Sequence, residues 1–449
     1  MTGRELLAGL DVGTTSVKAL LVAPDGTEVA LGRAPTPWAA TSSGAETAAA
    51  SITEAARAAL ADAVDQVAGD RVVAIGVASM AESGVLVGPD DGPLAPVIAW
   101  HDHRDESQLA DLVDTVGAQR FSARTGLPVW TQWSLTKYRW LVDHVPAART
   151  AVRRYNIAEW VARDLGAAPV TEVSLASRTG WLDLATRTAW SETMDWSGAP
   201  AVLLADLVSA GTPIGTARTS GRLAALDGAT LTVAGHDHQA AVVGVGSSGA
   251  GDELDSCGTA EAILRTVAPG LPAEAVLALT DAGVTVGWHA IPDRWCLLGA
   301  TQGGLVLGRV QAALGVDAGG LADLDAAALA AADDPTVLQI SETADVTVSP
   351  GADPGRIWRA AVLAVTGQAR DLGDHLDRAA GRRRDLVVAG GWTNSTAVMA
   401  AKTEAFGPLR RATTTEAGAR GAAFLAGLAH GTYSAYDDIP NGARPEDRP

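Results

Sequence analysis

The chain has 449 residues and a formal net charge of −18, with 52 acidic against 34 basic side chains. This charge argues against nucleic acids or anionic membranes as partners. The composition, 47% hydrophobic and 19% charged, is that of a globular protein of two or three domains, and no apolar run approaches the roughly 18 residues of a membrane span.

The first part of the chain, 1–246, is expected to form an α/β domain. Its elements are predicted as a strand meander over 1–35, an Ala-rich helix over 45–68, a buried strand over 72–78, helices over 105–116, 134–144 and 147–165, a strand over 230–234 and a helix over 237–246. The Gly/Ser-rich stretch 244–251 indicates a domain boundary.

A second domain is expected over 247–431 with a similar plan. Strands are predicted over 252–267 and 284–291, and helices over 303–314, 321–335, 354–380, 394–406 and 416–430. The segment 432–449 is expected to be a loose tail, because it is rich in Pro, Asp and Arg.

The most informative local pattern is a tight turn between two apolar runs near the N-terminus. Asp11 precedes Gly13-Thr14-Thr15, where glycine allows a sharp turn and hydroxyls lie beside exposed amides. Such a turn suits a phosphate whose charge is shared with a metal ion. A plain hairpin turn is the alternative.

A second copy of this pattern favours the phosphate interpretation. Gly258-Thr259 follows Gly13-Thr14 by 245 positions and is again flanked by apolar runs. We therefore expect two similar domains that offer facing turns to a shared cleft.

Asp237 follows a strand and opens a helix within Gly235-His236-Asp237-His238. At a helix N-terminus the carboxylate stays ionised, so it can be a helix cap or a general base. The two histidines also allow a metal site, but three adjacent residues rarely all face one ion.

Four further positions are candidates for binding. Glu82 ends a buried strand and suits vicinal hydroxyls, Trp100 ends another and suits the apolar face of a sugar, and Gly390-Gly391 allows close approach of a ring or phosphate. Each also has a purely structural interpretation as a loop, core or turn residue. A protein-kinase site is excluded because His103-Arg104-Asp105 lacks its partner motifs, and a Walker A loop because no Gly-Lys pair exists.

These pieces, in this order over about residues 6–430, resemble the FGGY carbohydrate kinases of the sugar kinase, Hsp70 and actin superfamily. The resemblance is carried by these segments: Gly9 to Lys18, Trp100 to Arg104, Ser174 to Gly180, Gly235 to Gly244, Ser256 to Thr259, Gly390-Gly391 and Glu416 to Ala423.

The resemblance implies an α/β fold of two ribonuclease H-like domains, the actin-like ATPase fold, flanking a central cleft. It implies transfer of the ATP γ-phosphoryl group to a sugar, ketose or sugar alcohol, with Mg²⁺ near Asp11 and Asp237 as the general base. The nucleotide would be bound by Gly13, Thr14, Thr15, Gly258, Thr259, Gly303, Gly390, Gly391 and Asn394, and the acceptor by Glu82, Trp100, Gln132 and Asp237.

Departures from the family pattern leave the substrate open. The pair Ala81-Glu82 stands where glycerol kinases have Arg-Glu, and Glu261-Ala262 replaces an aromatic residue, so glycerol is not the expected acceptor. The family's Gly-Glu-Arg-Thr-Pro region has no clear match between residues 340 and 356.

Two other functions remain alternatives at this point. One is a metal-dependent phosphohydrolase that uses the His/Asp clusters, and the other is a catalytically silent nucleotide-binding regulator. With two cysteines and no signal-peptide pattern, a reducing cytoplasm is the expected location. The oligomeric state is open, with a homodimer as one alternative.

Overall fold

The first Gly-Thr turn joins two antiparallel strands of a five-stranded sheet. The computed structural model describes residues 3–67, 69–204 and 206–445. The sheet has the order β12-β6-β1-β2-β3, in which β1, β2 and β3 are antiparallel neighbours and β6 and β12 continue parallel to β1. The strands are β1 (Glu5–Val12), β2 (Ser16–Val22), β3 (Glu28–Pro35), β6 (Arg71–Ser79) and β12 (Thr230–His236).

The second Gly-Thr turn occupies the same place in a seven-stranded sheet. Five of its strands, in the order β20-β19-β13-β14-β16, repeat the order and directions of the first sheet, and β15 and β21 lie at its edges. The strands are β13 (Asp252–Cys257), β14 (Glu261–Val267), β15 (Thr285–Trp288), β16 (Trp295–Thr301), β19 (Asp385–Ala389), β20 (Arg410–Ala412) and β21 (Ala443–Pro445). The two halves thus repeat one plan, as the paired turns predict.

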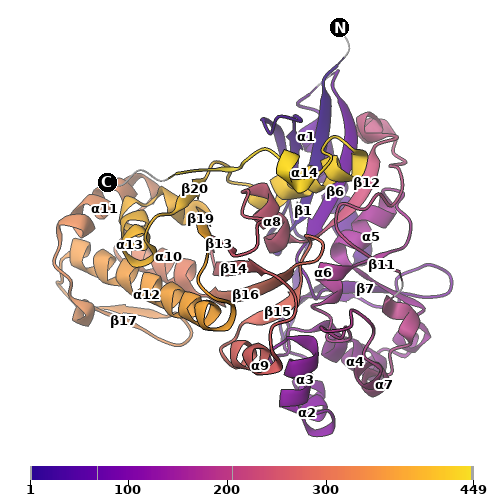
Figure 1. Cartoon of the computed structure of the whole chain (residues 1–449), viewed down its shortest axis with the longest axis horizontal. Coiled ribbons are helices and arrows are strands. Elements are labelled where there is room, and N and C mark those ends of the chain that lie inside the picture. The colour runs from indigo at the N-terminus through magenta and orange to yellow at the C-terminus, as the bar shows by residue number, and fades with distance from the viewer. Residues whose placement is uncertain (1–2, 68, 205, 446–449) are drawn as a thin grey trace.

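Two helices lie between the sheets, α8 (Asp237–Gly244) and the Ala- and Gly-rich α14 (Ala417–His430) (Figure 1). Their contacts are backbone-close, since a Cβ at Gly421 would lie 1.7 Å from the Ala240 carbonyl oxygen. A Cβ at Gly9 of β1 would lie equally close, at 1.7 Å, to the carbonyl oxygen of Ala419. One buried apolar cluster contains residues of α8, α14 and both sheets.

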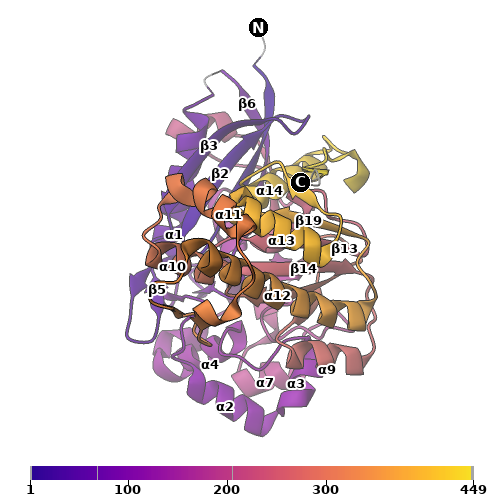
Figure 2. The same cartoon turned by 90° about the vertical axis from the view of Figure 1, so that its left-hand side faces the viewer.

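The remaining long helices cover the outer faces. Helix α1 (Ala49–Val64) packs on β2 and β3, and α5 (Ile157–Asp164) packs on β6 and β12. Figure 2 shows the outer layer of the second half, where α12 (Pro354–Ala380) contacts α10 (Gly303–Ala313), α11 (Leu321–Ala330) and α13 (Thr396–Phe406).

A helical insertion in the first half packs around buried tryptophans. Its helices are α2 (Glu106–Thr115), α3 (Ala118–Thr125), α4 (Ser134–His144) and α7 (Ser191–Ser197), and α9 (Ala273–Asp281) of the second half contacts α3. Trp133 and Trp181 are fully buried in this cluster. The short helix α6 (Val173–Ala176) lies apart from this cluster and contacts β10, β12 and β15. The shorter strands are β4 (Ala39–Ala40), β5 (Ala45–Thr47), β7 (Gly84–Val87), β8 (Val97–Ile98), β9 (Arg153–Asn156), β10 (Thr171–Glu172), β11 (Leu207–Val208), β17 (Leu338–Ile340) and β18 (Val346–Val348).

Some elements differ from the sequence predictions. The helix expected over 147–165 is wrong in its first half, where β9 pairs with β7 before α5 begins at Ile157. Asn156 and Glu159 form a capping box that starts α5 there. Helix α11 ends at Ala330, before the expected 335, and β16 was not predicted.

The expectation of a loose tail is also wrong for residues 432–445. Tyr433 is buried and donates its hydroxyl to the Pro24 carbonyl oxygen at 2.8 Å, and β21 pairs with β20. Residues 446–449 lie outside the described residues. The domain limits 1–246 and 247–431 stay a prediction, with the qualification that α14 packs against strands β1 and β6 of the first sheet.

Among the helices in the described ranges, none has both the length and the apolar character required for crossing a bilayer.

Candidate active site

Both Gly-Thr turns line one cavity of about 400 Å³. Its wall contains Gly13, Thr14, Thr15, Gly258, Thr259, Gly390 and Gly391, together with Asp11, Lys18, Glu416, Asp237 and His238. The turns are closed by their own backbone, since the Gly13 N–H donates to the Ser16 carbonyl oxygen at 3.2 Å and the Gly258 N–H to that of Ala260 at 3.0 Å. The fold therefore brings together two turns that are far apart in sequence.

Asp11 is the second-last residue of β1 and lines this cavity. Its Oδ1 is buried and has no hydrogen-bond partner among the described residues. Burial, followed by the nearby charge of Asp237, raises the pKa of Asp11 to about 7, against the opposing effect of Lys18. A buried, unpartnered carboxylate oxygen next to phosphate-binding turns fits a divalent cation with oxygen ligands.

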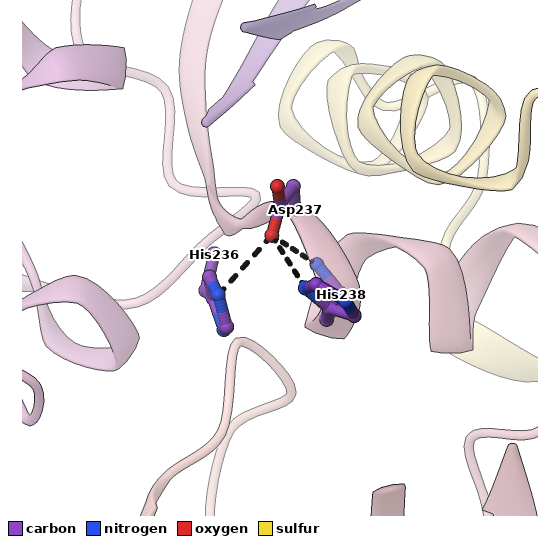
Figure 3. A group of neighbouring side chains, drawn as sticks. All are labelled: His236, Asp237 and His238. Carbon is purple, nitrogen blue, oxygen red and sulfur yellow. Dashed lines mark hydrogen bonds and ion pairs between the residues drawn. The ribbon is translucent and has the colours of Figure 1, made fainter. Parts of the chain in front are cut away.

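Asp237 opens α8 between two histidines (Figure 3). Its Oδ1 accepts the His238 backbone N–H at 2.7 Å and lies 2.9 Å from His238 Nδ1 and 3.1 Å from His236 Nε2. The described residues supply no hydrogen bond to its other oxygen. Burial opposes ionisation, but His238 and His236 outweigh it and hold the pKa of Asp237 well below its usual range. The carboxylate is thus ionised, with one oxygen held and one free.

The turn before Asp237 is positioned by the segment around Ser174. Gly235 has φ +85°, and a Cβ there would lie 2.5 Å from Ser174 Oγ. Ser174 Oγ accepts the His236 N–H at 3.1 Å and donates to Glu172 at 2.5 Å. Glycine is required at this position both for its conformation and for its close contact.

A second cavity of about 230 Å³ adjoins the first and shares Thr14, Asp237 and His238 with it. Its wall contains every predicted acceptor residue, Glu82, Trp100, Gln132 and Asp237, and also Trp130, Arg178 and Thr285. Trp100 is half-buried, and Trp130 is 42% exposed with its ring stacked on buried Trp133. Aromatic faces beside polar groups are the composition expected of a sugar site.

Glu82 is buried with φ +66° at the turn after β6. Its Oε1 accepts Arg178 Nε at 2.5 Å and Gln132 Nε2 at 3.2 Å. Burial raises the pKa of Glu82, and the charge of Arg178 opposes that rise. The structure therefore joins Glu82 and Gln132, which were predicted separately.

Arg178 was not predicted as a site residue. It spans from Glu82 to Thr285 Oγ1 of β15, at 3.1 Å, so it connects the two halves of the chain at the cavity wall. The signal available in the sequence was its place in Ser177-Arg178-Thr179, a segment that carries the family resemblance.

Two predicted nucleotide residues do not line the 400 Å³ cavity as the described residues define it. Gly303 begins α10, and a Cβ there would lie 2.7 Å from Glu261 Oε2. Asn394 is exposed and accepts a hydrogen bond from Arg411 at 2.9 Å. Their roles stay predictions.

Two clusters have the composition of metal sites. In His236-Asp237-His238 the ligand atoms lie within 4.8 Å of one another, as do those of Asp255, Cys257 and Glu261. In the second cluster the Lys402 ammonium already bonds both carboxylates. In the other His/Asp run, Arg104 pairs with Asp102, and His103 lies 3.0 Å from Thr131 Oγ1.

Residues 6–244 match the N-terminal domain of the FGGY family of carbohydrate kinases. Among curated proteins, the glycerol kinase of Aromatoleum aromaticum is 29% identical and aligns over 98% of this chain and 93% of its own. The glycerol kinase of Renibacterium salmoninarum is also 29% identical, over 82% of this chain and 77% of its own.

Solved structures show the same fold. The xylulose kinase of Rhodospirillum rubrum superposes with a TM-score of 0.86 at 25% identity, covering 98% of this chain and 93% of that one. The gluconate kinase of Lactobacillus acidophilus gives a TM-score of 0.87 at 21% identity, with 99% and 93% covered. These likenesses confirm the predicted α/β, actin-like ATPase fold.

The chain belongs to the FGGY family of carbohydrate kinases, since the family match spans more than half of it. It is accordingly a phosphotransferase with an alcohol group as acceptor, for which ATP is the implied phosphoryl donor and a small sugar or polyol the implied acceptor.

Proposed function

We propose that this protein transfers the γ-phosphoryl group of Mg-ATP to a hydroxyl of a sugar, ketose or sugar alcohol bound in the 230 Å³ cavity. The observation that carries the proposal is that Asp237 lines both cavities, between the phosphate turns and the acceptor residues. A general base that must meet an acceptor hydroxyl and a phosphoryl group belongs at that junction.

Asp237 would accept the acceptor's proton on the oxygen that His236 and His238 leave free. Its strongly lowered pKa makes it a weak base. Phosphoryl transfer passes through a loose transition state, so alignment and charge neutralisation matter more than proton abstraction. The bonds to Oδ1 fix the carboxylate and thereby orient the free oxygen.

Asp11 would help to hold Mg²⁺, which would neutralise charge on the β- and γ-phosphates. Gly13, Thr14, Thr15, Gly258 and Thr259 would hold the phosphates through amides and hydroxyls. Gly390 and Gly391 would approach the adenosine, with Gly303 and Asn394 as further nucleotide-side residues. The chain's few lysines leave these neutral groups as the main phosphate ligands.

Glu82, Gln132 and Arg178 would bind the acceptor's hydroxyl groups, and Trp100 would contact its apolar face. The curated relatives are glycerol kinases, while solved neighbours include xylulose and gluconate kinases. Ala81 in place of the glycerol kinases' arginine favours a larger acceptor than glycerol.

The test is an ADP-release assay with Mg-ATP across glycerol, tetritols, pentoses, ketoses and hexitols, each repeated with the D237N variant. Turnover of one polyol or sugar class that D237N abolishes would support the proposal. Mg-ATP binding without turnover on any of them would favour a nucleotide-binding regulator instead.

A further inference from the structure

Lysine occurs only three times in this chain, and none of the three side chains is fully exposed. Lys18 lines the phosphate cavity and pairs with Glu416 at 2.7 Å. Lys137 and Lys402 are buried, with 4% and 1% of their surface exposed. A buried ammonium is costly unless it is paired and hydrogen-bonded, so each must be held by a definite set of partners.

Lys402, on α13, lies under the second phosphate turn. Its Nζ donates to the Asp255 carboxylate of β13 and to Glu261 Oε1 of β14 at 2.5 Å. Glu261 is opposite Cys257 in the strand register, at the position that closes the Gly258-Thr259 turn. Lys402 thus holds together two carboxylates that would otherwise repel each other at the base of this turn.

The same cluster reaches the start of α10. Glu261 Oε2 accepts a hydrogen bond from Thr301 Oγ1 at 2.9 Å, and Thr301 Oγ1 accepts the Gly303 N–H at 3.2 Å. A Cβ at Gly304 would lie 1.8 Å from the Gly258 carbonyl oxygen. The first residues of α10 are therefore packed directly against the phosphate turn.

The Gly390-Gly391 turn packs against the end of β13, next to the cluster of Lys402, Asp255 and Glu261. Gly390 has φ +101°, and a Cβ there would lie 2.4 Å from the Cys257 carbonyl oxygen. This turn leads through a short 3₁₀ segment, Gly391–Asn394, into α13, which carries Lys402. Three segments on the nucleotide side of the cleft thus contact β13 and β14, whose carboxylates Lys402 bonds.

We propose that Lys402 is a positioning residue for the nucleotide: it holds the Gly258-Thr259 turn, the start of α10 and the Gly390-Gly391 turn in the arrangement that receives Mg-ATP. Neither Lys402 nor Asp255 or Glu261 lines the 400 Å³ cavity, so the effect passes through the backbone of these segments. The inference rests on the proposed function, because it assumes that Mg-ATP occupies this cavity.

The test is the dissociation constant of Mg-ATP, measured by isothermal titration calorimetry on the wild-type protein and on K402M. Methionine keeps the length and apolar body of lysine but leaves the two carboxylates without a positive partner, so we expect the turn to shift. We expect Mg-ATP binding at least about tenfold weaker, since small misplacements of a positioned group have effects of this size or more.

Arg265 supplies the matched control for a merely structural buried charge. It lies on the same strand pair but at the other end, bonded to Glu253 at 2.6 Å and to Asp377 at 2.8 Å, with 1% exposed. We expect R265M to lower the urea unfolding midpoint as K402M does, yet to leave the Mg-ATP dissociation constant within about twofold of wild type. Lys137 is also buried but lies in the first half of the chain, so K137M should likewise leave the Mg-ATP dissociation constant unchanged.

The outcomes separate clearly. Folded K402M that binds Mg-ATP like wild type would overturn the inference, as would an equal loss of affinity in R265M. If K402M does not fold, the D255N/K402M variant restores the cluster's net charge but still lacks the bridge from α13 to β13 and β14, and weaker Mg-ATP binding is expected from the loss of that bridge. Wild-type protein that binds no Mg-ATP would instead overturn the proposed function itself.

Discussion

Trp100 donates its indole N–H to the hydroxyl of Thr14 at 2.9 Å, which joins the wall of the acceptor cavity to the first phosphate turn. Trp38 donates to the Thr14 carbonyl oxygen, also at 2.9 Å. Two indoles from different segments thus fix one residue of the turn. A substitution at Trp100 should therefore alter the binding of both the acceptor and the nucleotide.

The W100F variant tests this connection. Phenylalanine keeps an aromatic face for the acceptor but cannot donate to Thr14, and one hydrogen bond contributes about 1 kcal/mol. We expect KM to rise several-fold for both the acceptor and ATP. Steady-state kinetics with each substrate varied in turn would measure this, and a change confined to the acceptor would show that the bond does not position the turn.

D237N tests the general base. Asparagine keeps the shape and can still interact with the start of α8, so the variant should fold. A general base typically contributes about 10²–10⁴-fold, so kcat should fall by that factor while Mg-ATP binding persists. Single-turnover rates and nucleotide titration would measure the two effects. Wild-type turnover by folded D237N would mean that Asp237 is only a structural residue.

Glu82 and Arg178 form a buried pair on the acceptor side of the site. E82A removes the carboxylate that we expect to bind hydroxyls, so KM for the acceptor should rise by at least about tenfold, as when a buried polar partner is lost. KM for ATP should stay unchanged. The E82Q variant keeps the side chain's size and serves as control for packing. Equal increases in both KM values would contradict the assignment.

Asp11 should make stability depend on pH and on Mg²⁺. Because its pKa in the folded protein is about 7, above its value in an unfolded chain, its contribution to stability is present at low pH and is lost as pH rises toward and through 7. Mg²⁺ binds the ionised form, so it should restore stability above this range.

The measurement is Tm between pH 5 and pH 8, with and without Mg²⁺, for wild type and D11N. The control variant has no carboxyl at this position, so the difference between the two proteins isolates Asp11 from Glu172 and Glu261, whose pKa values are also raised to about 7. A Mg²⁺ effect of equal size in D11N would exclude Asp11 as the ligand.

The C-terminal segment should contribute to stability. Tyr433 packs edge-to-face on Phe424 of α14 and bonds to Pro24, so it attaches this segment to the first half of the chain. Truncation of a buried aromatic side chain to alanine costs about 3–5 kcal/mol. We expect Y433A to lower the free energy of unfolding by about this amount in urea titration, whereas Y433F should lower it by only about 1 kcal/mol. A loose tail would predict no change in either.

Much of the site was predictable because its signals are local. The turn residues Gly13-Thr14 and Gly258-Thr259 are recognisable from glycine, hydroxyls and flanking apolar runs, and their repetition predicted two matching sheets. Asp237 was identifiable because a strand, a glycine and a helix start leave little freedom for the residue between them. Such signals depend on a few neighbouring residues, so they can be recognised without knowledge of the tertiary contacts.

The prediction failed where partners distant in sequence decide the structure. Residues 153–156 form a strand because β7 offers them an edge, which no helical pattern within 147–165 could reveal. Tyr433 and strand β21 of the C-terminal segment are held in place because Pro24 and β20 provide contacts for them.

The pairings of Arg178 with Glu82 and of Lys402 with Asp255 and Glu261 likewise required the tertiary structure. Most charged side chains are solvated, and the sequence does not show which few are buried against an opposite charge. The packing of segments 96 and 147 residues apart decides which opposite charge each of these residues meets, and that partner offsets the cost of burying it.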